Sequence, residues 1–188
     1  MTSVETERFI LRPFEAQDID FLNLLHGDAM VMRYILGRVR TAEENRAYLD
    51  RLLVLEQDHG IGQRIVILKD TMEPVGRCGF SFFYGIPEGD MTSYYVDPAA
   101  LPDGAASTRV VELGYTFLRE AWGKGYASEA AAAMADHGLI QQELPDIHSI
   151  IVKENTGSVA VANKLGAHRL GDCLCLGLPA WDYIWERK

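Results

Sequence analysis

The residue pattern with the clearest chemical meaning is Gly123-Lys124-Gly125, between an apolar segment and an alanine-rich one. Because glycine has no Cβ atom, Gly123 and Gly125 let the backbone turn tightly and let successive N–H groups face one point. If a helix begins directly after this turn, its free amides and its dipole attract an anion, and Lys124 adds a cation. The pattern predicts an anion-binding turn, but a plain strand-to-helix turn would use the same glycines for geometry alone.

This turn matches neither of the two common glycine-rich nucleotide motifs. Ser128 stands where G-x-G-x-x-G requires its third glycine, and the turn comes late in the chain instead of opening a βαβ unit. The GxxxxGK[ST] pattern is also absent, so the sequence does not support triphosphate binding. A diphosphate on another kind of carrier remains as the expected ligand.

A second unusual residue is Glu112, a carboxylate between Val111 and Leu113 in an otherwise apolar segment. A carboxylate placed near the turn could accept a proton through a water molecule. Alternatively, Glu112 faces solvent on the polar side of an alternating strand. The residues alone leave both interpretations open.

The histidines and cysteines show no reactive spacing. His148 is interpreted as structural, and Cys173 and Cys175, two positions apart, are expected to point to one face of a strand as small apolar residues. With Cys78 they form neither an even-numbered disulfide framework nor a CxxC pair. The other histidines are scattered without metal-ligand spacing: His26, His59, His137 and His168. No metal site and no nucleophile pair are predicted.

The elements that must position these residues alternate between strand and helix. Apolar alternation and β-branched runs predict strands over residues 8–14, 64–69, 75–84, 110–118, 147–152, 170–178 and 183–185. Helical spacing and a capping-box pattern at Thr41 predict helices over residues 16–25, 41–57, 127–138 and 158–165. Because a helix joins strands in the latter half, at least one strand pair there is expected to be parallel.

Residues 85–109 differ from the rest of the chain. They contain Pro87, Pro98 and Pro102, and only residues 94–96 suggest a short extended piece. We interpret the segment as an irregular excursion, since long loops in compact domains are usually functional or mobile.

Composition limits the class of protein. With 188 residues, 48% of them hydrophobic and 24% charged, the chain is expected to form one soluble globular domain over residues 1–188. The net charge of −9 and the lack of a basic cluster argue against nucleic acid as a partner. No apolar run is long enough to span a bilayer, and the first residues do not resemble a signal peptide, so we expect no membrane partner and a cytoplasmic location.

Four ordered motifs resemble the GNAT acetyltransferase superfamily, and within it the RimJ/RimL-type branch. They are Thr6-Glu-Arg-Phe-Ile-Leu-Arg-Pro13, Val111-Glu-Leu-Gly-Tyr115, Trp122-Gly-Lys-Gly-Tyr-Ala-Ser-Glu-Ala130, and Asn155-Thr-Gly-Ser158 with Asn163-Lys-Leu-Gly166. The resemblance covers nearly the whole chain. It implies a mixed α/β fold, with a mostly antiparallel sheet of about seven strands that is flanked by helices and splayed at its central strands.

The resemblance also implies acetyl-CoA as co-substrate and assigns roles to residues. Thr116, Phe117 and Leu118 would pair with the pantetheine arm, and Asn155 would contact this arm or cap a helix. Glu112 would handle the proton of an amine, and Ser158 would address the departing thiolate or serve as an ordinary first-turn serine. The backbone amides implied to hold the pyrophosphate belong to Gly123, Lys124, Gly125, Tyr126 and Ala127.

The chain departs from the superfamily pattern at three positions. Glu120 replaces the usual Gln or Arg before the turn, and is taken as solvated. Ala162 replaces the tyrosine that often serves as general acid, and Ala167 replaces the usual aromatic residue, so the tyrosine mechanism cannot be assigned. Because no nucleophile pair is predicted, we expect direct transfer without an acyl-enzyme. The missing tyrosine favours the alternative, a catalytically silent acyl-CoA-binding sensor.

The acceptor is only partly defined by the sequence. It is expected to be a primary amine, on a protein N-terminus or a small molecule, and the acidity of the chain favours a cationic one. Its pocket would be built by the two N-terminal helices and residues 85–109. The oligomeric state is expected to be a monomer or a homodimer.

Overall fold

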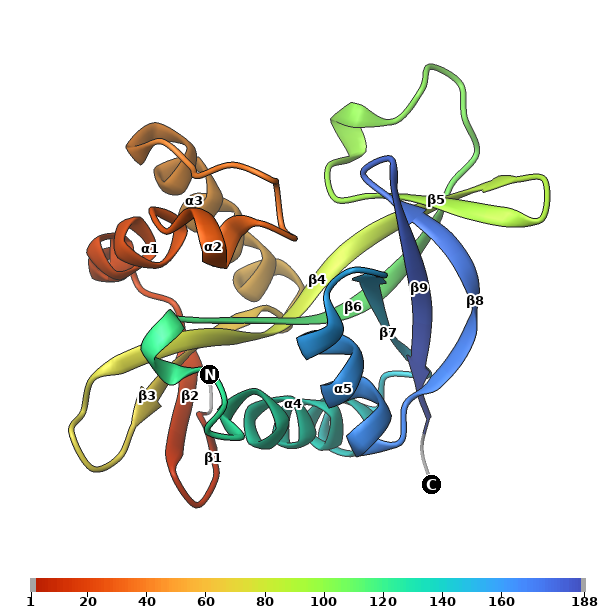
Figure 1. Cartoon of the computed structure of the whole chain (residues 1–188). Helices are drawn as coiled ribbons and strands as arrows, with labels where there is room; N and C mark the ends of the chain where they lie inside the picture. Colours follow the sequence, from red (N-terminus) through yellow and green to blue (C-terminus); the bar gives the residue numbers. More distant parts are fainter. Residues whose placement is uncertain (1–2, 187–188) are drawn as a thin grey trace. The chain divides into compact units, whose positions relative to one another are not determined.

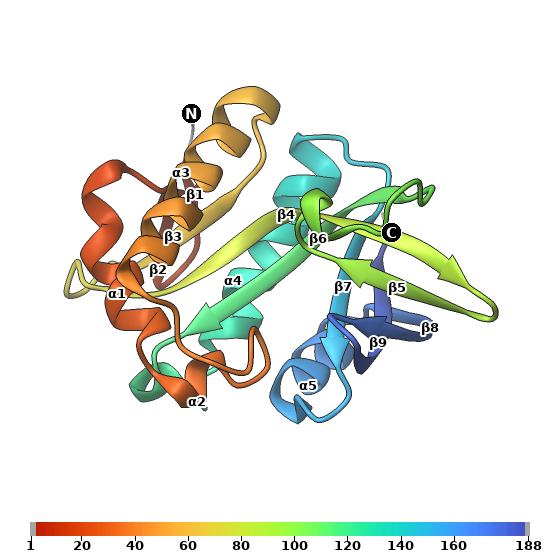
Figure 2. The ribbon, with the colours of Figure 1, turned by 90° about the horizontal axis from the view of Figure 1, so that it is seen from above.

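The computed structural model describes residues 3–186, and the chain divides into two compact units. The first unit contains the chain up to Gly79 together with Gly114–Met134, and the second contains Phe80–Leu113 with the chain from Ala135 onward. Strands β4 (Pro74–Glu88) and β6 (Thr108–Phe117) and helix α4 (Tyr126–Asp136) each contribute to both units. Figures 1 and 2 show the ribbon in two views.

The strands of the first unit pair antiparallel in chain order. They are β1 (Val4–Glu5), β2 (Phe9–Pro13), β3 (Gln63–Leu68) and the first part of β4. The start of β4 also lies against the end of β6, where Gly76 is required for the close approach. A Cβ atom at Gly76 would lie 2.5 Å from the Phe117 ring and 2.6 Å from the Thr116 carbonyl oxygen.

The helices of the first unit are η1 (Ala16–Asp18), α1 (Ile19–His26), α2 (Ala29–Met32), α3 (Ala42–His59) and η3 (Arg119–Ala121). The predicted capping box at the start of α3 is confirmed, because Thr41 and Glu44 each accept a hydrogen bond from the other's backbone. Gly60 ends α3 in the left-handed conformation, with a φ of 65°.

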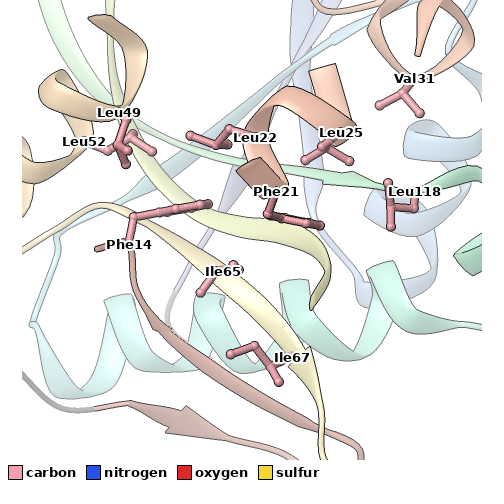
Figure 3. Close-up of a cluster of buried hydrophobic side chains, with 10 residues drawn as sticks. All are labelled: Phe14, Phe21, Leu22, Leu25, Val31, Leu49, Leu52, Ile65, Ile67 and Leu118. Atoms are coloured by element: carbon pink, nitrogen blue, oxygen red, sulfur yellow. The ribbon is translucent and has the colours of Figure 1, made fainter. Parts of the chain in front are cut away.

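The apolar faces of α1 and α3 pack on β2 and β3, as Figure 3 shows for the side chains of this core. Its buried members are Phe14, Phe21, Leu22, Leu25, Val31, Leu49, Leu52, Ile65, Ile67 and Leu118. Burial of this size fixes the helices against the sheet, since each fully buried large apolar side chain stabilises the fold by roughly 1.5–3 kcal/mol.

The sheet of the second unit is mixed. The end of β4 pairs antiparallel with β5 (Met91–Tyr95), and β5 pairs parallel with β8 (His168–Cys175). Antiparallel pairing continues from β8 to β9 (Leu178–Trp185) and from β9 to β7 (Ile147–Val152). The β6 and β7 strands run parallel, as predicted, and their register joins Glu112 to His148.

The two faces of this sheet carry different residues. Helix α5 (Thr156–Leu165) packs Ala162 and Val159 against Ile151 and Tyr183 on one face. A second apolar cluster contains Tyr94, Ile150, Cys173, Cys175 and Ala180. Because side chains alternate along a strand, Ile150 and Ile151 point to opposite faces, and the second cluster lies on the face away from α5. This second face also carries His148.

The segment predicted to be an irregular excursion is shorter than expected. Strand β4 continues to Glu88 and forms a hairpin with β5, which places Gly89 and Asp90 in a two-residue turn. Only the stretch after Tyr95, which contains η2 (Pro98–Ala100), connects irregularly to β6. A Gly-Asp pair between two extended runs is a hairpin signal, and the prolines outweighed it in the sequence-based interpretation.

Other boundaries also differ from the expectation. The strand predicted over residues 170–178 is interrupted at Leu176 and Gly177, whose φ values of 50° and 79° form the tight turn between β8 and β9. The described residues form nine strands, including β1 and β5, whereas the resemblance implied about seven. A π-helix at His137–Gln141 follows α4. No helix within residues 3–186 is long and apolar enough to cross a membrane.

Candidate functional site

The glycine turn lies in the first unit, and it has the conformation that the sequence predicts. Gly123 and Gly125 have φ values of 73° and 75°, a region that residues with a Cβ atom rarely adopt. Residues 122–125 are exposed, and α4 begins directly afterwards at Tyr126. The first N–H groups of a helix have no acceptor within it, so this turn presents donors to solvent. Glu120 is exposed, as expected.

An ion pair ties the glycine turn to β2. The Arg8 guanidinium donates to the Lys124 carbonyl oxygen at 3.0 Å and to the Glu129 carboxylate at 2.5 Å. Glu129 also accepts from the Thr6 hydroxyl at 2.6 Å. Burial opposes the charge on Glu129, but these hydrogen bonds outweigh it and lower its pKa. Since Arg8 and Glu129 balance each other, the positive character of the turn comes from its amides and Lys124.

The end of β6, where pantetheine pairing was expected, is partly occupied by contacts of the protein itself. The Leu118 amide donates to the Val75 carbonyl oxygen at 3.0 Å, on the edge that faces β4. The Phe117 carbonyl oxygen, which points to the other edge, accepts from the Trp122 indole at 2.8 Å. Alternate residues of a strand address opposite edges. Of Thr116, Phe117 and Leu118, which were expected to pair with pantetheine, Phe117 is therefore the one whose backbone N–H is directed away from β4.

Glu112 lies in the second unit and is 8% exposed, so the solvent-facing alternative for this residue is wrong. Its register partner on β7 is His148, which is 9% exposed. Partners in register on neighbouring strands point to the same face and lie close together. A carboxylate and an imidazole are thus neighbours inside the second unit.

His148 belongs to a buried hydrogen-bond network that the sequence did not predict. Its Nδ1 atom lies 2.8 Å from the Asp182 Oδ1 atom, and the Tyr94 hydroxyl donates to the Asp182 Oδ2 atom at 2.7 Å. Burial alone would lower the pKa of His148, but the bond to Asp182 outweighs it and raises this pKa. Burial and the bond to Asp182 both raise the pKa of Tyr94, which keeps the phenol protonated.

No sequence spacing indicates this network, since His148 and Asp182 are 34 residues apart and Tyr94 is 88 residues from Asp182. The one local signal is a polar residue within an apolar strand, as at Glu112. Asp182 stands between Trp181 and Tyr183, and His148 follows Ile147.

The N-terminus of α5 carries the other two predicted residues. Asn155 caps the helix, because its side-chain oxygen accepts from the Ser158 amide at 3.2 Å. The capping role is confirmed, and a contact of Asn155 with the cofactor arm stays a prediction. Ser158 lies in the first turn and is half-buried. Ala162 is fully buried against the sheet, so its position offers no acid.

The cysteines are structural. Cys78, Cys173 and Cys175 are free and buried, and the latter two share one apolar cluster, as predicted. Burial, with nearby negative charge, raises the pKa of Cys173 and of Cys175 to about 12. A thiol held in this state is a poor nucleophile. Among the described residues, no three His, Cys, Asp or Glu side chains are grouped to hold a metal ion.

Each unit therefore contains one part of the predicted site. The first holds the glycine turn with Tyr126 and Ala127, together with Thr116, Phe117 and Leu118; the second holds Glu112, Asn155 and Ser158. Strand β6 is continuous through both, carrying Glu112 in the second unit and Thr116 and Phe117 in the first.

Comparisons with known proteins agree with this description of the fold. The family model described as "Acetyltransferase (GNAT) domain" matches residues 8–168. The uncharacterized protein YkkB of Bacillus subtilis is 30% identical over 168 residues, which are 89% of this chain and 86% of that protein. A crystal structure of a GNAT-family acetyltransferase from Bacillus anthracis has a TM-score of 0.69 and 27% identity, and the match covers 97% and 96% of the two chains.

The structure of RimL, a ribosomal L7/L12 α-N-protein acetyltransferase in complex with coenzyme A, has a TM-score of 0.74 over 98% of both chains. At 15% identity, this likeness shows a shared fold. The family model covers most of the sequence, and the strands, the turn and the helix after it are all present. The chain belongs to the GNAT acetyltransferase family, and it is an acyltransferase.

Proposed function

We propose that this protein transfers the acetyl group of acetyl-CoA directly to a primary amine, with Glu112 as the proton acceptor. The observation that carries the proposal is the burial of Glu112 beside His148, on the strand that leads to the glycine turn. The family membership supports acetyl transfer, and the residues of this chain supply the base and the cofactor contacts.

The turn fits the pyrophosphate of acetyl-CoA. Exposed amides follow two glycines in the left-handed conformation, and a Cβ atom at Gly123 would meet no atom within 4 Å. The amides of Gly123 through Ala127 would hold the diphosphate, and Lys124 would add charge. The Phe117 amide and the α5 terminus at Asn155 would contact the pantetheine arm. Bound acetyl-CoA supplies an activated thioester.

The need for a base depends on the amine. A lysine-like amine, with a pKa near 10.4, is neutral only about 0.04% of the time at pH 7, which costs about 4.6 kcal/mol. An α-amine with a pKa near 7.8 costs only about 1 kcal/mol. A buried carboxylate such as Glu112 therefore matters most for an amine of the first kind.

The proposed reaction has one bond-forming step. The neutral amine attacks the thioester carbonyl carbon, a C–N bond forms, and the C–S bond breaks as the thiolate leaves. Glu112 accepts the amine proton through a water molecule, and His148, whose pKa is raised by its bond to Asp182, is the register partner of this carboxylate. Ser158 would donate a hydrogen bond to the leaving sulfur. The backbone N–H of Tyr115, which alternation along β6 directs to the same edge as that of Phe117, would donate to the carbonyl oxygen.

A panel of amines tests the proposal. Purified protein and acetyl-CoA should release free thiol and yield an equal amount of acetylated amine with at least one acceptor, either a peptide N-terminus or a small amine. A structurally similar acetyltransferase from Salmonella typhimurium is described as modifying the N-terminal serine of ribosomal protein L7/L12, so peptides with a free N-terminal serine belong in the panel. Because Ala162 replaces the usual acid, the competing function is an acyl-CoA sensor. Tight acetyl-CoA binding without turnover of any amine would support the sensor.

Two variants separate chemistry from cofactor binding. Glu112→Gln should lower turnover at neutral pH and leave acetyl-CoA affinity nearly unchanged. Gly125→Val should mainly weaken acetyl-CoA binding, because valine strains the left-handed backbone and its side chain approaches Arg8. An equal loss of affinity and turnover in Glu112→Gln would count against its assignment as the base.

A further inference from the structure

A group of cations surrounds Tyr48 in the first unit. The guanidinium carbons of Arg40, Arg77 and Arg51 lie 4.7, 5.5 and 5.9 Å from the centre of the Tyr48 ring. The His26 ring packs edge-on against the same ring, with 5.3 Å between centroids. These residues come from α1, the segment before α3, α3 itself and β4. We call Tyr48, His26 and the three arginines the Tyr48 cluster.

The charges of the Tyr48 cluster are not balanced by carboxylates. No ion pair of the described residues includes Arg40, Arg51 or Arg77, although Arg12, Arg38 and Arg64 in the same unit all have one. Arg77 donates instead to the neutral amide oxygen of Gln63 at 2.8 Å.

The nearest carboxylate acting on Arg40 belongs to Glu44, which is already bound by Arg38 at 2.6 Å. Burial lowers the pKa of Arg40, and the charges of Arg77 and Arg51 lower it further, against opposing contributions from Tyr48 and Glu44. The cluster thus gathers like charges at a cost to the folded state.

Buried polar atoms of the Tyr48 cluster lack hydrogen-bond partners. They are the Nε atoms of Arg40 and Arg77 and the Nε2 atom of His26. Arg77 is 8% exposed and His26 is 1% exposed, so solvent does not readily supply the missing bonds. A buried donor or acceptor that stays unsatisfied destabilises the folded state.

The protonation of His26 follows from its contacts. Its Nδ1 atom lies 2.7 Å from the Asn45 side-chain oxygen, and the Asn45 amide nitrogen donates to Asn23 at 2.9 Å. An amide oxygen only accepts, so Nδ1 carries the proton. Burial and the charge of Arg77 lower the pKa of His26 to about 3, which keeps the ring neutral and leaves Nε2 as an acceptor.

We propose that the Tyr48 cluster is a binding site for a carboxylate or phosphate group of a small ligand. Guanidinium groups bind such anions through paired hydrogen bonds, and an anion here would satisfy the Arg40 and Arg77 donors and offset the repulsion between them. A hydroxyl or protonated oxygen on the same group would donate to His26 Nε2. The site stands independently of acetyl transfer, and it gathers cations in a chain whose net charge is −9.

The test uses inorganic phosphate and succinate as probes, at pH 7.5 and at constant ionic strength set with sodium chloride. Either probe at about ten times its dissociation constant should raise the Tm of the wild-type protein by roughly 3 °C. Arg40→Gln and Arg77→Gln should lose this rise. Arg46→Gln, which removes an exposed cation from the same region of α3, should keep it.

When the two probes are compared at equal concentration, the larger rise identifies the preferred anion, phosphate or carboxylate. If Arg77→Gln does not fold, Arg40→Gln and NMR of the wild type decide: phosphate should shift the His26 Nε2 resonance and leave that of the exposed His59 unchanged. No rise in the wild type, or the same rise in all the variants, would overturn the proposal.

Discussion

Each unit contains a buried histidine, and the surroundings shift the pKa values of the two histidines in opposite directions. His26 in the first unit faces an amide oxygen and nearby guanidinium groups, and its pKa falls to about 3. His148 in the second unit contacts the Asp182 carboxylate, and its pKa rises. Both residues are buried, and burial alone would lower both pKa values. At His26, burial and the Arg77 charge outweigh the bond to Asn45, whereas at His148 the bond to Asp182 outweighs burial.

The surroundings of His148 and His26 also differ in how many of their polar atoms have hydrogen-bond partners. In the second unit, Asp182 joins the His148 ring to the Tyr94 hydroxyl, and the Ser149 hydroxyl joins Trp185 to the Leu113 carbonyl oxygen. In the first unit, the Tyr48 cluster keeps donors and an acceptor without partners. A network of paired polar atoms holds its groups in place, and the proposed role of Glu112 as proton acceptor requires such fixed surroundings. An open network keeps polar atoms that a ligand could satisfy.

The largest predicted effect concerns the neutral histidine. Because the folded pKa of His26 lies below its unfolded value near 6.5, stability is complete above pH 6.5 and falls as the pH drops toward 3. Between pH 6.5 and pH 4.5 this loss approaches about 3 kcal/mol. Urea unfolding at several pH values measures it. In His26→Gln, this part of the pH dependence should disappear, and an unchanged slope would show that His26 is not held neutral.

The second prediction concerns His148, the histidine whose pKa is raised. Asp182→Asn should cost about 2 kcal/mol near pH 6, because a buried charge-assisted hydrogen bond is lost. Since the folded pKa of His148 is raised, the difference from wild type should be greatest below pH 6.5 and should shrink as the pH rises through that pKa. Asp172→Asn, at an exposed ion pair with Lys153, is the control and should change little. A pH-independent difference would contradict an ionic pair.

A smaller effect is expected from Tyr94→Phe. It removes one hydrogen bond to Asp182 and keeps the ring in its apolar cluster, so the free energy of unfolding should fall by about 1 kcal/mol. The His148 pKa should stay above 6.5 in NMR titration, because Asp182 keeps its charge. Tyr95→Phe on the same strand serves as the control. A normal or lowered His148 pKa in Tyr94→Phe would mean that the network acts through Tyr94.

The smallest predicted effect is a rise in Tm, where the other variants are expected to lose stability. Arg51→Gln should slightly raise the Tm at low salt, because it removes a like charge from the Tyr48 cluster. The gain should fade at high salt, where the exposed charge is screened. Thermal unfolding at low and high sodium chloride measures both. A lower Tm at low salt would show that Arg51 is not repelled by its neighbours.

Local patterns predicted most of the fold. The Thr41 capping box, the Gly60 helix end and the glycine turn each depend on residues within a few positions of one another, so sequence spacing is sufficient to find them. The hairpin between β4 and β5 was missed because Pro87 outweighed the Gly89-Asp90 turn. This proline is compatible with the strand because it lies near its end.

The site was predicted only where a single residue stands out from its surroundings. Glu112 could be found because a carboxylate in an apolar strand is unusual. The pair of Arg8 and Glu129 spans 121 residues, and the Tyr48 cluster gathers residues from four segments, so both depend on tertiary packing. The counts of charged residues show that the chain is acidic, but they cannot show that unpaired cations collect around the Tyr48 ring.

The central functional claim is that Glu112 takes the proton of the acceptor amine. The most direct measurement compares kcat/KM of wild type and Glu112→Gln at pH 7, for one lysine-like amine and one α-amine that the wild type acetylates. The account predicts a loss of roughly 100-fold for the lysine-like amine and of less than about tenfold for the α-amine. Equal losses for the two amines, with acetyl-CoA affinity intact, would contradict it.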